Sequence, residues 1–354
     1  MKITLEILLP LIQFLVQTIN AQLGEQMSFT AKDITVFIFT RNRPNMVTDA
    51  VKSVLNQTAG PVKLYVLDNS TDEKTTNAIK AFTSVQYVKT DPSLPYANFK
   101  KLQSLADSAY TMVLHDDDLI HPQYVQLALE ALNKIKDITY IGSKNTIFYN
   151  NDIPEEYKKP KSLKKEFYLL PNDNLFTLSF WSKPNSNWSS SIIKTECYKN
   201  YDIAKDAKIY GKTQDLAFLS QTMKTGGNAV IFTDGNILFY RNHMQSDSND
   251  KRTALSKEQI KNLLKLFLSK SKNPHFLSRI YFLYSVYIAK QYFSAGHDEN
   301  ETQAFLKELL TEGIISKNML LYDRRKKSLL LRLAFFPIQI FYKRNFWKAY
   351  LHKL

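Results

Sequence analysis

Residues 110–122, YTMVLHDDDLIHP, hold the densest group of side chains that could do chemistry. An apolar run ends at His115 and is followed by three consecutive carboxylates, Asp116, Asp117 and Asp118. Adjacent carboxylates repel one another and Asp is a poor strand former, so this arrangement needs a compensating partner. A divalent cation is such a partner, because it prefers oxygen ligands and would also neutralise a bound phosphate.

Polar residues also follow the other apolar runs of the N-terminal half. Thr40 and Arg41 lie at the end of ITVFIFT, and Asp68 ends VKLYVLD. In open α/β sheets, ligands bind outside the carboxyl ends of the strands, so these residues are expected to share one sheet edge. The chain has nine glycines and neither a GxGxxG nor a GxxxxGK[ST] loop. The sequence therefore predicts that phosphate, if bound, is neutralised by a divalent cation held by carboxylates.

Alternating elements must position these residues. Apolar runs alternate with segments of helical periodicity over about 33–141, with predicted strands at 34–40, 62–68, 85–90, 110–115 and 138–143. Strands that alternate with helices predict an α/β fold with a Rossmann-like, mixed but mostly parallel sheet flanked by helices.

The rest of the chain predicts three regions. Residues 150–184 are polar and rich in Lys and Pro, which favours loop or edge structure, and the pattern after Leu255 is helical. We expect an N-terminal helical extension over 1–32, a catalytic domain over 33–250, and a basic C-terminal helical region over 251–354. The apolar stretch near the N-terminus contains Glu and Gln residues, which favours an ordered or membrane-touching helix over a cleaved signal peptide.

Composition narrows the class of protein. The single cysteine, Cys197, excludes an intrachain disulfide and favours a reducing, cytoplasmic location. The net charge of +14 favours an anionic partner. Residues 315–354 hold ten Lys and Arg against one Asp, whereas the predicted sheet edge is acidic. A basic segment interleaved with Leu, Phe, Trp and Tyr fits an anionic membrane surface rather than nucleic acid, and packing of this segment on the core remains an alternative.

Five segments resemble motifs of family 2 glycosyltransferases, which use nucleotide sugars and have the GT-A fold. They are FTRNRP, VLDNSTD, LHDDDLIHP, GKTQDLAFLSQTMKTGG and YRNHMQSDS, in the family's order over about residues 33–249. Two positions depart from the family. His115 occupies the place of the first aspartate of the DxD motif, and Gln214 occupies the place of a glutamate before Asp215.

The resemblance implies a role for each matching residue. The expected contacts of the nucleotide sugar are Thr40, Arg41, Asp68, Asp116 and Arg241, with Asp68 at the base and Arg241 at the pyrophosphate. The expected metal ligands are Asp117, Asp118 and His243. Asp215 would be the general base that activates the acceptor hydroxyl. Ordinary structural roles also fit these residue types: a turn at Asp68, a helix N-cap at Asp215, and a surface position for His243.

The resemblance further implies an inverting transfer of a sugar that depends on Mn²⁺ or Mg²⁺. The donor is expected to be a nucleotide-diphosphate sugar, UDP-linked in most such enzymes. The acceptor is expected to be a hydroxyl of a glycan or of a lipid-linked acceptor, in surface polysaccharide synthesis such as capsule or O-antigen, at the inner face of the cytoplasmic membrane. Two other classes stay open: a nucleotidyltransferase that forms nucleotide sugars, and a non-catalytic basic protein that binds membrane or nucleic acid.

Overall fold

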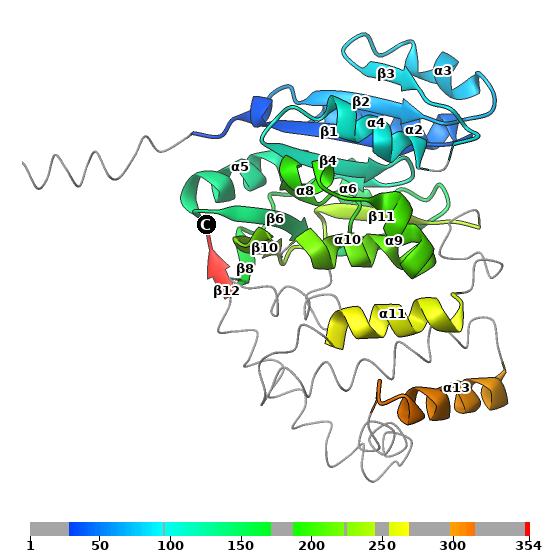
Figure 1. The fold of residues 1–354 in the computed structure, drawn as a ribbon. Coiled ribbons are helices and arrows are strands. Elements are labelled where there is room, and N and C mark those ends of the chain that lie inside the picture. Colours follow the sequence, from blue (N-terminus) through cyan, green and yellow to red (C-terminus); the bar gives the residue numbers. More distant parts are fainter. Residues whose placement is uncertain are drawn as a thin grey trace, which may run out of the picture.

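The computed structural model describes residues 28–94, 96–170, 187–222, 225–244, 255–268, 298–315 and 351–354. Within them, a nine-stranded sheet has the order β12-β8-β10-β6-β9-β4-β1-β2-β3 (Figure 1). Its strands are β1 (Ile34–Thr40), β2 (Lys63–Asp68), β3 (Gln86–Lys89), β4 (Tyr110–His115), β6 (Ile138–Ser143), β8 (Glu166–Leu170), β9 (Ile192–Lys194), β10 (Asn228–Phe232) and β12 (Leu351–Lys353).

The sheet is mixed, as the sequence predicts. The block β4-β1-β2-β3 is parallel, and so is the pair β6-β10. β9 runs antiparallel to both of its neighbours, β4 and β6, and β8 runs antiparallel to β10. The predicted strands at 34–40, 110–115 and 138–143 have the observed bounds. Their runs are buried on both faces, which is why the apolar residues are continuous in the sequence.

Helices cover both faces of the sheet. They are α2 (Pro44–Leu55), α3 (Lys74–Ile79), α4 (Ala97–Leu105), α5 (Tyr124–Lys134), α6 (Glu155–Lys158), α8 (Thr195–Lys199), α9 (Ile203–Tyr210), α10 (Gln214–Thr222), α11 (Lys257–Leu268) and α13 (Glu299–Thr311). Side chains alternate along β1, so Val36 and Ile38 pack with α2 and α5, whereas Phe37 packs with α4, α8 and α10. The central strands are thereby fixed from both sides.

A second sheet of three strands lies beside the acidic segment. β5 (Leu119–Ile120) and β7 (Asn145–Tyr149) flank β11 (Leu238–Asn242). β5 follows the three aspartates directly, and its antiparallel pairing with β11 brings Arg241 and His243 to them. The sequence pattern predicts a strand-like character for the β11 segment, but not this sheet.

The C-terminal residues differ from the expected helical region. Leu351–Lys353 form β12, which pairs antiparallel with β8 at the edge of the central sheet, so the helical prediction is wrong there. α11 and α13 are helical, as expected, and share a small core. Residues 1–27 of the N-terminal helical extension predicted over 1–32, and residues 316–350 of the basic region, lie outside the described residues. No helix in the described part of the chain is long and apolar enough to span a membrane.

Candidate functional site

The candidate site lies where parallel strands end side by side. β1 is the neighbour of both β2 and β4, and the register places Thr40 beside Asp68 and Phe39 beside His115. A cavity of about 400 Å³ opens at this edge. Its lining residues come from the loops after β1, β2 and β4, from α4 and from β11: Phe39, Thr40, Arg41, Arg43, Asn69, Asn98, His115, Asp116, Asp117 and Tyr240.

The loop after β1 is held to the loop after β2. Asn42 has a φ of 56°, a left-handed conformation that Asn tolerates better than most residues. Its backbone N–H donates to Ser70 Oγ at 2.6 Å, and its side-chain carbonyl accepts from the Thr71 N–H at 2.9 Å. Pro44 then starts α2 in the first helical turn, where proline costs no hydrogen bond. The cavity wall is therefore built from two cross-linked loops.

Asp116 is the centre of a buried polar cluster. Thr40 Oγ1 donates to its Oδ2 at 2.8 Å, and the Arg43 guanidinium donates to its Oδ1 at 2.9 Å. Burial raises the pKa of Asp116, and the neighbouring Arg43 charge opposes this shift. The predicted residues Thr40 and Asp116 therefore contact each other. Arg41 lies in the same cavity wall, where its backbone N–H reaches Asp116 Oδ2 at 3.4 Å.

Asp117 is held by two cationic or potentially cationic groups. His243 Nε2 lies 3.0 Å from Asp117 Oδ2, and Arg43 Nη1 lies 3.3 Å from the same oxygen. His243 is buried, so it is not the surface residue that the sequence left open. The structure thus brings the expected ligands Asp117 and His243 together through a hydrogen bond.

Asp118 is fully buried, and its two oxygens differ. Oδ1 accepts the backbone N–H of Arg241 at 3.0 Å, whereas Oδ2 has no hydrogen-bond partner in the described residues. Burial, together with the charge of Asp117, raises the pKa of Asp118 to about 7. A buried carboxylate oxygen without a partner is costly, and a bound cation would offset that cost.

Three side chains present a set of metal-binding atoms. One potential ligand atom each from His115, Asp117 and Asp118 lies within 4.8 Å of the other two. Imidazole nitrogen and carboxylate oxygen are established ligand types for divalent metals. The residues therefore fit a divalent cation. His243 is not in this group and instead contacts the ligand candidate Asp117.

Arg241 does not line the cavity, and its predicted contact with the pyrophosphate stays a prediction. The side chain is buried and lies over the Phe148 ring, with 4.9 Å between Cζ and the ring centroid. Its guanidinium donates to the Asp117 carbonyl, to Asn150 and Asn151, and to Asp49 Oδ2 at 3.1 Å. These partners make Arg241 a structural link between β11, the aspartate segment and α2.

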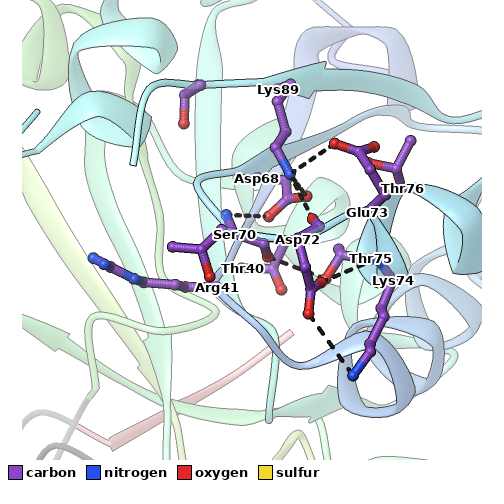
Figure 2. Close-up of polar contacts among 12 residues, drawn as sticks. Thr40, Arg41, Asp68, Ser70, Asp72, Glu73, Lys74, Thr75, Thr76 and Lys89 are labelled. Carbon is purple, nitrogen blue, oxygen red and sulfur yellow. Dashed lines mark hydrogen bonds and ion pairs between the residues drawn. The ribbon is translucent and has the colours of Figure 1, made fainter. Parts of the chain in front are cut away.

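Asp68 is buried at the end of β2, where both of its carboxylate oxygens have polar partners (Figure 2). Oδ1 accepts the Ser70 N–H at 2.7 Å, and Oδ2 accepts from Tyr87 Oη at 2.7 Å and lies 3.4 Å from Lys89 Nζ. The turn role considered for Asp68 is thus present. Its contact with a nucleobase stays a prediction, since Asn69 rather than Asp68 lines the cavity.

Asp215 lies in the first turn of α10, on the face of the sheet that also carries Trp188. Burial raises its pKa, and His115 is near enough to oppose part of the shift. Trp188 connects the two regions: its ring packs edge-to-face on His115, 5.8 Å between centroids, and contacts Phe218 of α10. Asp215 is not in the cavity wall, and a hydrogen bond from the Leu216 backbone N–H lowers its pKa against the effect of burial.

The sequence analysis assigned no role to Arg43. Its guanidinium lines the cavity and bridges Asp116 and Asp117. The signal that could have indicated it is a second arginine three residues after the strand end, in a loop predicted to face three carboxylates. Tyr240 was missed as well, because its approach to the cavity depends on the small second sheet.

A mixed α/β sheet with an acidic cluster at the carboxyl ends of β1 and β4 is the arrangement of a GT-A fold. Residues 35–199, just under half of the chain, match the model of glycosyl transferase family 2. The family match confirms the family predicted from the motifs. A search of curated proteins by sequence finds no match.

Solved structures with a similar fold include S. aureus TarS 1–349 in complex with UDP-GlcNAc. The identity is 15%, the match covers 74% of this chain and 72% of that chain, and the TM-score is 0.50. A longer S. aureus TarS chain matches with 14% identity over 74% of this chain and a TM-score of 0.48. The match spans 43% of the length of that longer chain. Mannosyltransferase PcManGT from Pyrobaculum calidifontis, in complex with GDP-Man and Mn²⁺, matches with 10% identity over 89% of this chain and 91% of that chain (TM-score 0.43).

Proposed function

We propose that the chain is an inverting glycosyltransferase that moves a sugar from a UDP-linked donor to a hydroxyl of a glycan or lipid-linked acceptor. The observation that carries this proposal is the shared cavity. The loop after β1, with Thr40, Arg41 and Arg43, and the segment His115–Asp117 face the same space of about 400 Å³. Cationic and carboxylate groups in one cavity suit a metal-bound diphosphate, and the family supplies the class of reaction.

The donor would lie along the carboxyl edge of β1 and β2. Asn69 and Arg41 line the part of the cavity nearest β2, where the loop fixed by Asp68 would receive the nucleotide. Figure 2 draws the Arg41 side chain extending away from the Asp68 cluster, so it is available to a ligand rather than to that cluster. The choice of UDP is supported by the TarS fold, which holds UDP-GlcNAc in its crystal structure.

Two groups of residues would have separate roles in the reaction: one would bind the cation, and the other would remove the proton of the acceptor hydroxyl. Asp117 and Asp118, with His115 beside them, would hold a divalent cation. When bound, that cation supplies charge that stabilises the leaving diphosphate. Asp215 would take the proton of the acceptor hydroxyl while that oxygen bonds to the anomeric carbon, and the bond from this carbon to the diphosphate oxygen breaks. Its raised pKa suits a base, because a more basic carboxylate accepts a proton more readily.

The biological role that we propose for this transfer is surface polysaccharide synthesis, at the inner face of the cytoplasmic membrane. The support is the charge of the chain: +14 overall, with ten Lys and Arg in residues 315–354. Such a segment would attract anionic lipid, which would bring the site to a lipid-linked acceptor. Most of these residues lie outside the described ranges, and their composition is the support for a membrane contact.

A thermal-shift titration with UDP, with and without Mn²⁺, tests the donor proposal. We expect stabilisation by UDP that increases when Mn²⁺ is present, because a ligand that binds the folded state raises its stability. A panel of nucleotide sugars, scored by hydrolysis, would then identify the sugar. Asp117→Ala and Asp215→Ala should abolish transfer and keep the fold by circular dichroism. Full transfer by both variants would contradict the assignment.

A further inference from the structure

The potential metal ligands at the end of β4 are one nitrogen, from His115, and two carboxylate oxygens, from Asp117 and Asp118. The nitrogen distinguishes this group from an all-oxygen site. His115 closes β4 and contributes a ring nitrogen within 4.8 Å of carboxylate oxygens from Asp117 and Asp118. Its backbone N–H donates to Ser189 Oγ at 3.1 Å, and its ring packs edge-to-face on Trp188. The ring is therefore held in the cavity wall before any ligand binds.

The two carboxylates are prepared for a cation in different ways. Asp118 is fully buried and carries the oxygen that has no partner among the described residues. Asp117 is oriented by His243 at 3.0 Å and by Arg43 at 3.3 Å. Contacts from outside the ligand set fix the direction of a ligand and tune its affinity. His243 is thus suited to orient Asp117, while His115 is suited to bind.

We propose that His115 is a direct metal ligand and that its nitrogen sets the metal preference of the site toward Co²⁺ and Mn²⁺ over Mg²⁺. Mg²⁺ prefers oxygen ligands in strict octahedral geometry, whereas imidazole favours first-row transition metals. Within that series, affinity rises from Mn²⁺ to Co²⁺ at sites of this type. The inference rests on the proposed function for the role of the metal, but the binding itself is measurable without turnover.

Pulsed EPR of Mn²⁺ bound to the full chain in the presence of UDP tests the ligand directly. The wild-type protein should show ¹⁴N modulation from a coordinated imidazole. His115→Asp should bind Mn²⁺ without that modulation. His243→Gln is the matched control: it keeps a hydrogen-bond donor opposite Asp117 and should retain the modulation. Loss of the ¹⁴N signal in His243→Gln and its retention in His115→Asp would overturn the assignment.

Calorimetric titration of the same proteins tests the preference. We expect the ratio of the Mg²⁺ to the Co²⁺ dissociation constant to fall by about tenfold or more in His115→Asp, because an oxygen replaces the nitrogen. An unchanged ratio, or no metal binding by the wild-type chain with UDP, would overturn the proposal. Metal binding through His115 without activity on any nucleotide sugar would contradict the proposed function alone.

Discussion

At the scale of single residues, the site is governed by how three neighbouring carboxylates are kept stable. Arg43 bridges Asp116 and Asp117, the backbone of Arg241 binds Asp118, and Thr40 binds Asp116. Each contact supplies hydrogen bonds or positive charge to a buried anion. Contacts within the chain therefore balance much of the repulsion expected from the sequence, while Asp118 Oδ2 has no hydrogen-bond partner among the described residues.

Replacing Arg43 tests how much its contact with Asp116 stabilises the folded chain. In Arg43→Ala the buried Asp116 loses its ionic partner, so we expect a loss of about 1–3 kcal/mol in the free energy of unfolding. Urea denaturation at pH 7 measures it. Arg41→Ala is the matched control for stability, because Arg41 is exposed and only its backbone touches Asp116. Equal losses in both variants would argue against a specific role for the Arg43 bridge.

Replacing Asp215 should separate activity from stability. Asp215→Asn removes the proposed base, so transfer should fall by about 10²–10⁴-fold. Burial raises the pKa of Asp215, so the folded state favours the protonated form, and its contribution to stability is lost as pH rises through the folded pKa. The Asn variant should therefore melt at a higher temperature than wild type at pH 8, and this gain should vanish as pH falls to about 4.

The matched control for that variant is the helix cap Asp202, whose side chain accepts the Lys205 N–H at 3.1 Å. Asp202→Ala should lose about 1 kcal/mol of stability and retain sugar transfer. Asp215→Asn, in contrast, should gain stability at pH 8 and lose sugar transfer. A destabilised but fully active Asp215→Asn would show that Asp215 has only a structural role.

At the scale of elements, the local sequence pattern predicts the strands whose bounds depend only on neighbouring residues. β1, β4 and β6 have the expected bounds because each is a continuous apolar run. The small sheet β5-β11-β7 depends on pairing between residues more than 90 positions apart, which no local period reveals. For the same reason the sequence could group Asp116 with Thr40 through the strand ends, but could not foresee that Arg241 would turn inward onto Asp49 and Asn151.

The entry into β10 provides a test of packing between elements. Gly227 has a φ of +87°, and a Cβ there would lie 2.2 Å from Thr139 Oγ1 and 2.7 Å from the Asp137 carbonyl. Gly226 has the same φ, but a Cβ there would meet nothing within 4 Å. Gly226→Ala should cost about 1–2 kcal/mol from backbone strain alone, and Gly227→Ala clearly more, because β10 must also move away from β6. Equal urea midpoints for the two variants would contradict this account.

At the scale of the whole molecule, the densest basic stretch and the candidate site are separated along the chain. Asp68 and Asp116–Asp118 lie at the carboxyl edge of the sheet, whereas the densest basic stretch lies between α13 and β12 in sequence. β12 pairs with β8, so both ends of that stretch are attached to described structure. A membrane contact made by the stretch would therefore act on the body that carries the site.

Vesicle flotation can show whether the basic stretch binds lipid. Each Lys or Arg near an anionic surface contributes about 1 kcal/mol, so replacing Arg324, Arg325, Lys326 and Lys327 with Ala should weaken binding to phosphatidylglycerol vesicles by about 10³-fold. Replacing Lys158, Lys159, Lys161 and Lys164 with Ala removes the same net charge elsewhere and should leave most binding intact. Binding of the wild-type chain should also fall steeply between 0.05 and 0.5 M salt, roughly, because the Debye length shortens. Equal losses in the two variants would show that diffuse net charge, rather than the C-terminal stretch, directs the protein to anionic lipid.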